Sequence, residues 1–434
     1  MRALWVVNTP VYIDDEHTTS TRGGWMEGAL KAVANELEIC ITFPIQEKKI
    51  EEEDINNISY YYFSYNQFEN KKIKYDTKLE ENLKHIIEKS TPDIIHIWGT
   101  EYLHSLAAVN AARKLGLIDR VVINLQGLVS VYASHYAAGI PSKYMRGNTI
   151  SERCRGISLK GDIRSLQIKG EYEKQTLLNV KHVIGRTDWD KACALQINKK
   201  LQYHFCNETL RRNFYDGNKW EYLNCEKHTL FITQPGHPIK GIHIVLQALA
   251  LIKKEYPDVI LYATGENIFR KSSNSGIVNR VLSILPEKYQ KTSYIRFLLS
   301  IINKYDLTQN IIFLGELSKE DMYKQFLKTN VFVSASSIEN ESNAISEAHI
   351  LGVPIVASYV GGVTNRIRHD MDGFLYPYNE PYMLAYYVCQ LFADPPKAEK
   401  FSRNGINYAN KINDALTNKK QLIEIYNKIC GDTL

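Results

Sequence analysis

The sequence contains few of the features that mark a membrane-spanning or secreted chain. No run of about 18 apolar residues is present, the length that a membrane-spanning helix needs. The short apolar run at residues 3–8 precedes no small-residue cleavage site, so we interpret it as a buried strand and not as a signal peptide. Seven cysteines are scattered without Cys-x-x-Cys spacing, which argues against a disulfide framework or a zinc site. We therefore predict a cytoplasmic protein without a bound metal.

Excess charge is also scarce, since the net charge is only +5 over 434 residues, but it is concentrated in one stretch. Residues 141–170 hold seven basic and two acidic side chains, an excess equal to that of the whole chain: Lys143, Arg146, Arg153, Arg155, Lys160, Arg164 and Lys169 against Glu152 and Asp162. Two interpretations stay open. The stretch is either a solvated loop, or a site for an anionic acceptor or for peripheral contact with the inner face of a membrane. No nucleic-acid-binding motif accompanies it, so nucleic acid is not a predicted partner.

Short apolar, β-branched runs alternate with helical patterns, which is typical of parallel sheets in α/β proteins. In the first half we expect strands at 3–8, 39–43, 60–65, 93–98, 120–125 and 182–185, and helices at 25–35, 77–89 and 103–115. After a polar stretch at 215–227 we expect strands at 229–233, 259–263, 311–314, 331–334, 354–358 and 373–376, and helices at 242–256, 319–328 and 344–351. Residues 267–296 form an insertion for which the pattern predicts no structure.

Two such series with a break near residue 225 predict an α/β protein with two Rossmann-like lobes, whose parallel sheets face a central cleft. We assign 1–222 to an N-terminal lobe and 223–412 to a C-terminal lobe. We expect 413–434 to form a C-terminal helix that packs back toward the N-terminal lobe. Ligands of such sheets bind beyond the carboxyl ends of the strands. No Gly-x-Gly-x-x-Gly follows any strand, which disfavours a dinucleotide oxidoreductase.

The most informative segment is 331–362, which reads as a strand, a loop, a helix, a glycine stop, a buried strand and a Gly-Gly turn. Glu339 lies in the loop, and Glu347 lies one turn into the helix, because Ser342 or Asn343 is a good N-cap. The two carboxylates thus flank a helix start, where free backbone N–H groups bind anions or sugar hydroxyls. Two glutamates alone would be a weak signal, and two solvated glutamates at a helix entry are the plain alternative. The surrounding pattern makes the signal strong.

Two further loops follow the first strand of each half. The segment 231–241 ends in Lys240-Gly241 at a helix start, where a lysine opposes the helix dipole unless an anion lies nearby. Its compact ammonium suits a phosphate. In the first half, Gly23 and Gly24 open a helix, and glycines let the backbone approach a phosphate or sugar closely. A simple turn explains the two glycines equally well.

Together these segments resemble the donor-binding signature of retaining glycosyltransferases of the GT-B fold, specifically glycosyltransferase family four, the glycosyl transferases group one. The resemblance covers most of the second half and, more loosely, the first. It implies that the N-terminal lobe binds the acceptor and the C-terminal lobe the nucleotide sugar. It also implies that Glu339 contacts the transferred sugar, Glu347 the ribose and Lys240 the diphosphate, with Glu339 and Lys240 as the catalytic pair. The implied donor site comprises Gly23, Gly24, Gln234, Lys240, Gly265, Glu339, Ser342, Asn343, Ala344 and Glu347.

The sequence departs from the family pattern at two places. The family usually has Gly-Arg before Lys-Gly, but Gln234 or its neighbours stand at the position of the arginine, and Arg186, Arg211 or Arg212 are the candidates to replace its charge. Many relatives carry a His-Gly at the end of the fifth strand, where this chain has Gln126-Gly127. The acceptor candidates are His96, Gln126, Arg186 and Asp188. A core role for His96, and a helix N-terminal role for Asp188 and Asp190, are equally open.

The resemblance implies a hexosyltransferase-like enzyme that moves a sugar from a UDP- or GDP-linked donor to a glycan or lipid-linked acceptor in surface polysaccharide synthesis. Retention by front-face departure and attack needs no side-chain base, because a phosphate oxygen of the donor takes the proton. The protein would orient both substrates and stabilise the leaving diphosphate, and no cofactor is expected. The alternatives are a nucleotide-sugar epimerase or phosphorylase on the same fold, or a non-catalytic sugar-nucleotide-binding partner subunit.

Overall fold

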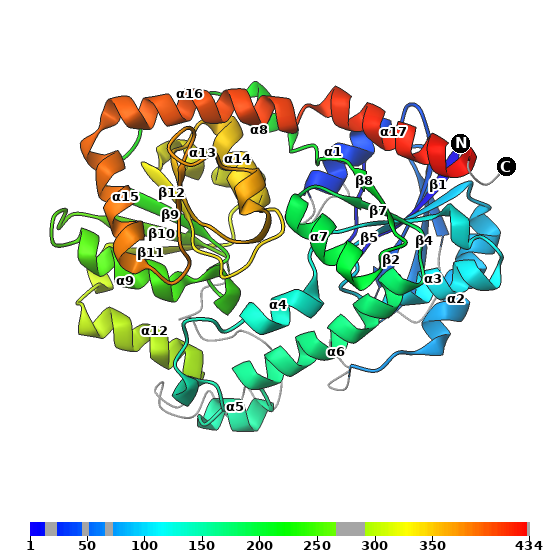
Figure 1. The fold of residues 1–434 in the computed structure, drawn as a ribbon, viewed down its shortest axis with the longest axis horizontal. Coiled ribbons are helices and arrows are strands. Elements are labelled where there is room, and N and C mark those ends of the chain that lie inside the picture. Colours follow the sequence, from blue (N-terminus) through cyan, green and yellow to red (C-terminus); the bar gives the residue numbers. More distant parts are fainter. Residues whose placement is uncertain (14–23, 46–51, 66–72, 266–290, 432–434) are drawn as a thin grey trace. The chain divides into compact units, whose positions relative to one another are not determined.

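The computed structural model describes residues 1–13, 24–45, 52–65, 73–265 and 291–431. The chain forms two compact α/β units (Figure 1). Unit 1 comprises Met1–Tyr132, Leu166–Tyr215 and Asn410–Leu434, and unit 2 comprises Ala133–Ser165 and Asp216–Ala409. Within the described ranges, every helix is too short or too polar to cross a lipid bilayer.

The sheet of unit 1 has eight strands in the described residues, in the order β3-β4-β2-β1-β5-β6-β7-β8. They span β1 (Arg2–Val6), β2 (Glu38–Ile45), β3 (Glu52–Ile55), β4 (Ile58–Ser64), β5 (Ile94–Trp98), β6 (Val121–Asn124), β7 (His182–Gly185) and β8 (Gln202–Phe205). All neighbours pair in parallel except β3 and β4, which are antiparallel. The central strand β5 is buried along its whole length, as expected for a parallel strand covered on both faces.

The described helices of unit 1 are α1 (Gly24–Val33), α2 (Thr77–Ser90), α3 (Leu103–Lys114), α7 (Asp188–Ile197), α8 (Arg212–Asp216), α17 (Ala415–Gly431) and most of α4 (Val129–His135) and α6 (Leu159–Leu178). Helix α17 returns from the end of the sequence and packs beside α1 (Figure 1). Its Tyr426 is fully buried, and the Tyr426 hydroxyl accepts a hydrogen bond from the Trp5 indole at 3.1 Å. Residues more than 400 positions apart thus share one hydrophobic core.

The sheet of unit 2 has six described strands, all parallel, in the order β11-β10-β9-β12-β13-β14. They are β9 (Thr229–Thr233), β10 (Ile260–Thr264), β11 (Ile311–Gly315), β12 (Val331–Ser334), β13 (Ile355–Ser358) and β14 (Phe374–Tyr376). The helices are α5 (Ile150–Arg155), α9 (Ile242–Ile252), α12 (Ser293–Lys304), α13 (Lys319–Lys328), α14 (Asn343–Leu351), α15 (Pro381–Ala393) and α16 (Pro395–Ile412). Strands β9 and β12 are neighbours, which places the loops after them side by side.

These elements confirm the predicted class, an α/β fold with two Rossmann-like lobes. Every predicted strand is present, but β3 and β8 were not predicted. Of the predicted insertion, 267–290 lies outside the described residues, and α12 covers 293–296.

The predicted boundary at residue 222 needs correction, because residues 133–165 belong to unit 2. The carbonyl of Ala138 accepts hydrogen bonds from Tyr378 at 2.8 Å and from the His243 imidazole at 3.0 Å. The carbonyl of His135 accepts one from Ser337 at 2.8 Å. Residues 216–222 also join unit 2, where the Trp220 amide donates to Leu351 at 2.7 Å. The basic stretch therefore lies mainly in the second unit and not in the first.

Candidate functional site

The loops after β9 and β12 bring Lys240 and Glu339 together in unit 2. The Lys240 Nζ lies 2.6 Å from Glu339 Oε2, although 99 positions separate the residues. The Ser336 hydroxyl donates to the same carboxylate oxygen at 3.1 Å. The side chains of Lys240 and Glu339 are 23% and 10% exposed, so the ion pair is largely shielded but open on one side. The sequence predicted both residues as site residues, and adjacent strands explain why they meet.

Two glycines allow the backbone to crowd around this ion pair. Gly241 has a φ of 70°, and a Cβ there would lie 1.9 Å from the carbonyl oxygen of Ala335. Gly361 has a φ of 47°, and its Cβ would lie 2.0 Å from the carbonyl oxygen of Glu339. The amide of Gly362 donates to that same carbonyl at 2.9 Å. The Gly-Gly turn after β13 therefore fixes the backbone of Glu339, a contact that only glycine at position 361 permits.

A second ion pair, which the sequence did not predict, involves Glu341 of the same loop. Arg366 Nη2 lies 2.8 Å from Glu341 Oε1, and the two side chains are 4% and 0% exposed. Arg366 follows the 3₁₀ turn Gly361–Asn365. A buried carboxylate and guanidinium must be paired because an isolated buried charge is very costly. This pair ties the Glu339 loop to the Gly-Gly turn. No sequence pattern links positions 341 and 366.

The N-terminus of α14 completes this part of unit 2. Ser342 occupies the N-cap position, so Asn343 and Ala344 form the first turn, whose amides point away from the helix as anion-binding donors. The Ser342 side chain makes no capping hydrogen bond. Glu347 is half-buried one turn further along, as predicted.

The remaining predicted donor residues cluster less closely. Gln234 is exposed at the end of β9, with a φ of 53°. The backbone N–H of Gln234 donates to the carbonyl of Thr264 at 2.7 Å. Gly265, with a φ of 128°, lies against the Cα of Gln234. Gly24 begins α1 in unit 1, and Gly23 lies outside the described residues.

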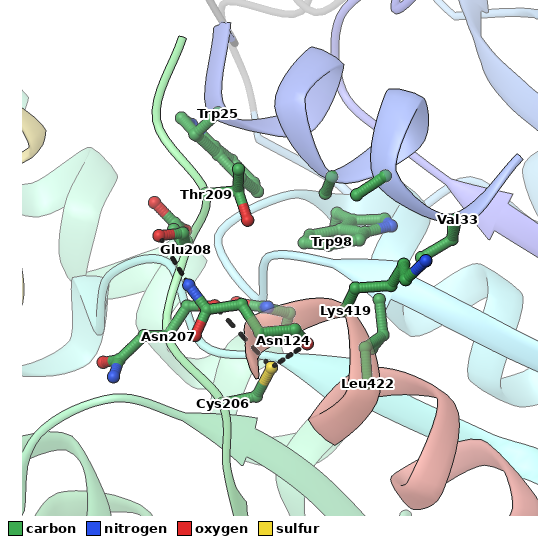
Figure 2. A pocket seen from close by; sticks show the side chains of 13 residues that line it. Trp25, Val33, Trp98, Asn124, Cys206, Asn207, Glu208, Thr209, Lys419 and Leu422 are labelled. Carbon is green, nitrogen blue, oxygen red and sulfur yellow. Dashed lines mark hydrogen bonds between the residues drawn. The ribbon is translucent and has the colours of Figure 1, made fainter. Parts of the chain in front are cut away.

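Unit 1 contains a pocket at the carboxyl edge of its sheet, and the space of about 380 Å³ between its walls includes open solvent (Figure 2). Trp98 at the end of β5 and Trp25 on α1 form an aromatic wall, with ring centroids 5.2 Å apart. Polar side chains of Asn124, Glu208 and Lys419 face them, and the last comes from α17. An aromatic wall opposite hydrogen-bonding groups is the arrangement that a sugar ring or another polar ring can use.

Gln126 and Arg186 lie in one polar network beside this pocket. The Gln126 amide donates to Asn124 Oδ1 at 2.7 Å and to Glu208 Oε1 at 3.2 Å. Arg186 forms an ion pair with Glu208, and both side chains are almost completely buried. The guanidinium also donates to the carbonyl of Leu125 at 3.0 Å. Sequence reasoning missed Glu208, because it follows β8, which was itself not predicted.

The other two acceptor candidates have different environments. His96 is fully buried, its Nδ1 lies 2.5 Å from the Tyr426 hydroxyl, and its ring stacks on Trp98. Burial lowers the pKa of His96 to about 3. The prediction of an acceptor contact is therefore wrong for His96, which is a core residue covered by α17. Asp188 is exposed in the first turn of α7, where the helix dipole stabilises a negatively charged side chain.

Asp190 explains the turn that precedes α7. Thr187 and Asp190 form a reciprocal capping box. Asp190 also accepts hydrogen bonds from the Arg186 amide at 2.9 Å and from the Tyr203 hydroxyl at 2.6 Å. The alternative of a helix N-terminal role is the one that the structure supports for Asp190.

Similar solved structures share this two-lobed architecture, the GT-B fold. Sucrose-phosphate synthase (tll1590) from Thermosynechococcus elongatus superposes with a TM-score of 0.70 at 16% identity, covering 99% of both chains. Anabaena Alr3699/HepE in complex with UDP and glucose gives 0.66 at 15% identity, covering 99% of this chain and 100% of that one. A glycosyltransferase from Rickettsia africae ESF-5 gives 0.62 at 14% identity, covering 99% and 98%. At these identities the likeness shows the fold.

Sequence comparison matches the second half of the chain to one family of transferases. Residues 226–408, nearly all of the second strand–helix series, match the family model of glycosyl transferases group 1. The putative glycosyltransferase YtcC of Bacillus subtilis (strain 168) is 22% identical over 194 residues, 44% of this chain and 43% of YtcC. The D-inositol 3-phosphate glycosyltransferase of Corynebacterium urealyticum is 22% identical over 191 residues, 44% and 41% of the two chains. The matched segments span less than half of each relative. Fold and family model together support a GT-B glycosyltransferase.

Proposed function

We propose that this protein transfers a sugar, with retention of its anomeric configuration, from a UDP- or GDP-linked donor to a glycan or lipid-linked acceptor. The observation that carries the proposal is the Lys240–Glu339 pair beside the start of α14, inside the region matched by the group 1 family model. A cation and a helix N-terminus suit a diphosphate, and a carboxylate beside them suits the hydroxyls of a sugar ring. All three lie at one edge of the sheet. Alr3699/HepE, which shares the fold, forms a complex with UDP-glucose, which supports the choice of donor class.

In this proposal Lys240 stabilises the negative charge that develops on the leaving diphosphate. Glu339 is held in place by Ser336 and by the backbone of Gly362, so its carboxylate can accept hydrogen bonds from sugar hydroxyls without reorganising. Glu347 binds the ribose, and the first-turn amides of α14 bind the donor near its phosphates. A donor phosphate oxygen takes the acceptor proton, so the reaction needs no side-chain base.

The acceptor is proposed to bind unit 1 at the pocket that Trp25 and Trp98 line. The Gln126–Glu208–Arg186 network fixes the polar side of that pocket. Arg186 is poorly suited to replace the family's diphosphate-binding arginine, because its side chain is almost completely buried against Glu208, whereas that of Lys240 is partly exposed. We place the reaction in the cytoplasm, in the assembly of a surface polysaccharide at the inner face of the membrane.

Thermal-shift measurements with UDP- and GDP-sugars test the donor assignment, because a ligand that binds the folded state raises its melting temperature. Glu347→Ala should weaken nucleotide binding, whereas Glu339→Ala should mainly lower turnover. Glu320→Ala is the matched control, since Glu320 is an exposed glutamate in the first turn of α13. Wild-type behaviour of both site variants would remove the assignment.

Product analysis separates the proposed reaction from its alternatives. A transferase releases nucleotide only when acceptor is present, an epimerase turns over without acceptor, and a non-catalytic subunit binds donor without turnover. The anomeric configuration of the product, read by NMR, tests retention. An inverted product would contradict the proposed mechanism while leaving sugar transfer intact.

A further inference from the structure

The basic stretch presents five cations to solvent in unit 2. Lys143, Arg146, Arg153, Lys160 and Arg164 are all exposed, and none of them forms an ion pair with another described residue. Many other surface lysines of the protein do form such pairs, as Lys324 does with Glu320 and Lys114 does with Glu81. The five residues, termed the basic surface below, therefore project uncompensated positive charge.

Two apolar side chains stand among these cations. Ile150, the first residue of α5, is 41% exposed, and Ile157, just beyond the end of the same helix, is 42% exposed. Isolated exposed isoleucines are common. Two that bracket one short helix inside a cluster of cations form a surface that is both apolar and positively charged, the combination that the headgroup region of an anionic bilayer accommodates.

The basic surface is held on a rigid base. The buried carboxylate of Glu152 accepts hydrogen bonds from the Thr149 amide at 3.1 Å and from the Ser293 amide and hydroxyl at 2.8 and 2.6 Å. These contacts fasten α5 to the start of α12. The Lys160 amide donates to the Met145 carbonyl at 3.1 Å, which joins the segments before and after α5. The backbone around α5 is thus ordered before docking, which therefore needs little further ordering of it.

The only two acidic side chains of the stretch do not offset this charge at the surface. The Glu152 carboxylate accepts the internal hydrogen bonds described above, and its side chain is almost completely buried. Asp162 is half-buried, and burial raises the pKa of its carboxyl. A region that sequence counting described as +5 overall therefore exposes five of its seven basic side chains, whereas Glu152 is buried and Asp162 is half-buried.

We propose that the basic surface docks the protein on a bilayer that contains anionic lipid, with Ile150 and Ile157 entering the headgroup region between the cations. A polyanionic glycan or a nucleic acid could pair with the cations but would leave the two isoleucines exposed to water. An anionic bilayer accommodates both the cations and the isoleucines, so we favour the bilayer. The inference concerns where the protein binds, so it stands whether or not the proposed sugar transfer is correct.

Vesicle co-sedimentation tests it, with phosphatidylcholine vesicles containing or lacking phosphatidylglycerol. Each cation near an anionic leaflet contributes about fivefold in affinity, so Arg153→Gln with Lys160→Gln should lower binding about thirtyfold. The matched control is Lys199→Gln with Lys200→Gln, which removes two exposed cations from the turn before β8 and the same net charge. This control should bind vesicles nearly as the wild type does.

Ile150→Ser with Ile157→Ser tests the apolar part, with an expected loss of at least several-fold at low salt. Raising the salt to about 1 M shortens the Debye length to about 3 Å and should release the wild type. Equal losses in the Lys199/Lys200 control, or pelleting of the wild type with phosphatidylcholine alone, would overturn the proposal. Unchanged binding of the isoleucine variant together with strong binding to heparin would assign the surface to polyanions instead. Melting temperatures and donor-induced thermal shifts of all variants show that folding and the donor site are intact.

Discussion

Replacing Lys240 by Met removes the cation at the start of α9 and keeps most of the length of the side chain. In the structure its ammonium lies 2.6 Å from Glu339 Oε2, and the Lys240 side chain as a whole is 23% exposed. A hydrogen bond to a charged group contributes about 1.5–3 kcal/mol. At about 1.4 kcal/mol per tenfold change, Lys240→Met should weaken UDP binding about 10- to 150-fold.

The same substitution leaves Glu339 without its ion-pair partner, which must be separated from the loss of the phosphate contact. Glu339 keeps its hydrogen bond from Ser336, so we expect the free energy of unfolding to fall by about 1–2 kcal/mol and the fold to survive. A double-mutant cycle with Glu339→Gln measures the coupling of the pair, expected at about 0.5–3 kcal/mol in stability.

Isothermal titration calorimetry with UDP measures the affinity, and chemical denaturation measures the stability. Lys253→Met is the control, because Lys253 lies at the other end of α9 and is paired with Asp306 at 3.5 Å. The reasoning fails if Lys240→Met binds UDP as tightly as the wild type, or if Lys253→Met loses as much affinity.

Three further substitutions probe the surroundings of the site and the core. Arg366→Met removes the ion-pair partner of the buried Glu341 and should cost about 3–5 kcal/mol of stability in urea unfolding, and adding Glu341→Leu should restore most of it. Equal stability of the single variant and the wild type would contradict this. Gly361→Ala forces a Cβ against the Glu339 carbonyl and should lower the free energy of unfolding by about 2–4 kcal/mol and weaken UDP binding, and an unperturbed melting temperature would show that the turn yields easily. Burial lowers the pKa of His104 from 6.5 to about 3. As the pH falls, His104 is therefore protonated in the unfolded chain before it is protonated in the folded one. The stability that its neutral form contributes is fully present above pH 6.5 and is lost as the pH falls toward 3. His104→Phe should therefore flatten the pH dependence of unfolding between pH 6 and 4 by about 1.4 kcal/mol per pH unit, and an unaltered slope would rule out His104 as a source of it.

Hydrophobic pattern was sufficient to predict the interior strands of both sheets but not the two edges of the first. Strand β3 reads Glu-Glu-Asp-Ile and β8 reads Gln-Tyr-His-Phe. Among the described residues both are short strands at the edges of the sheet, where polar residues disfavour further strand pairing. The apolar signal that identifies a buried strand is therefore absent where they occur.

The same physical limit applies to the site. Lys240 and Glu339 could be predicted to meet because each follows a strand with a recognisable loop and helix start. The pairs Glu341–Arg366 and Arg186–Glu208 join residues that share no period or spacing, so only the tertiary structure brings them together. His96 was misjudged because its cover, Tyr426, comes from a helix 330 positions away.

That distant cover affects the order in which the chain can fold during synthesis. Unit 2 has its whole sequence once Ala409 has been made, whereas unit 1 lacks α17 until residues 415–431 follow. Until then Trp5 and His96 lack the Tyr426 hydroxyl, and the core that α1 forms on that face of the first sheet lacks the apolar side chains of α17. Domains that appear first in the sequence usually fold first on the ribosome. Here the unit that contains the first strand is completed only after the whole of unit 2 has been made.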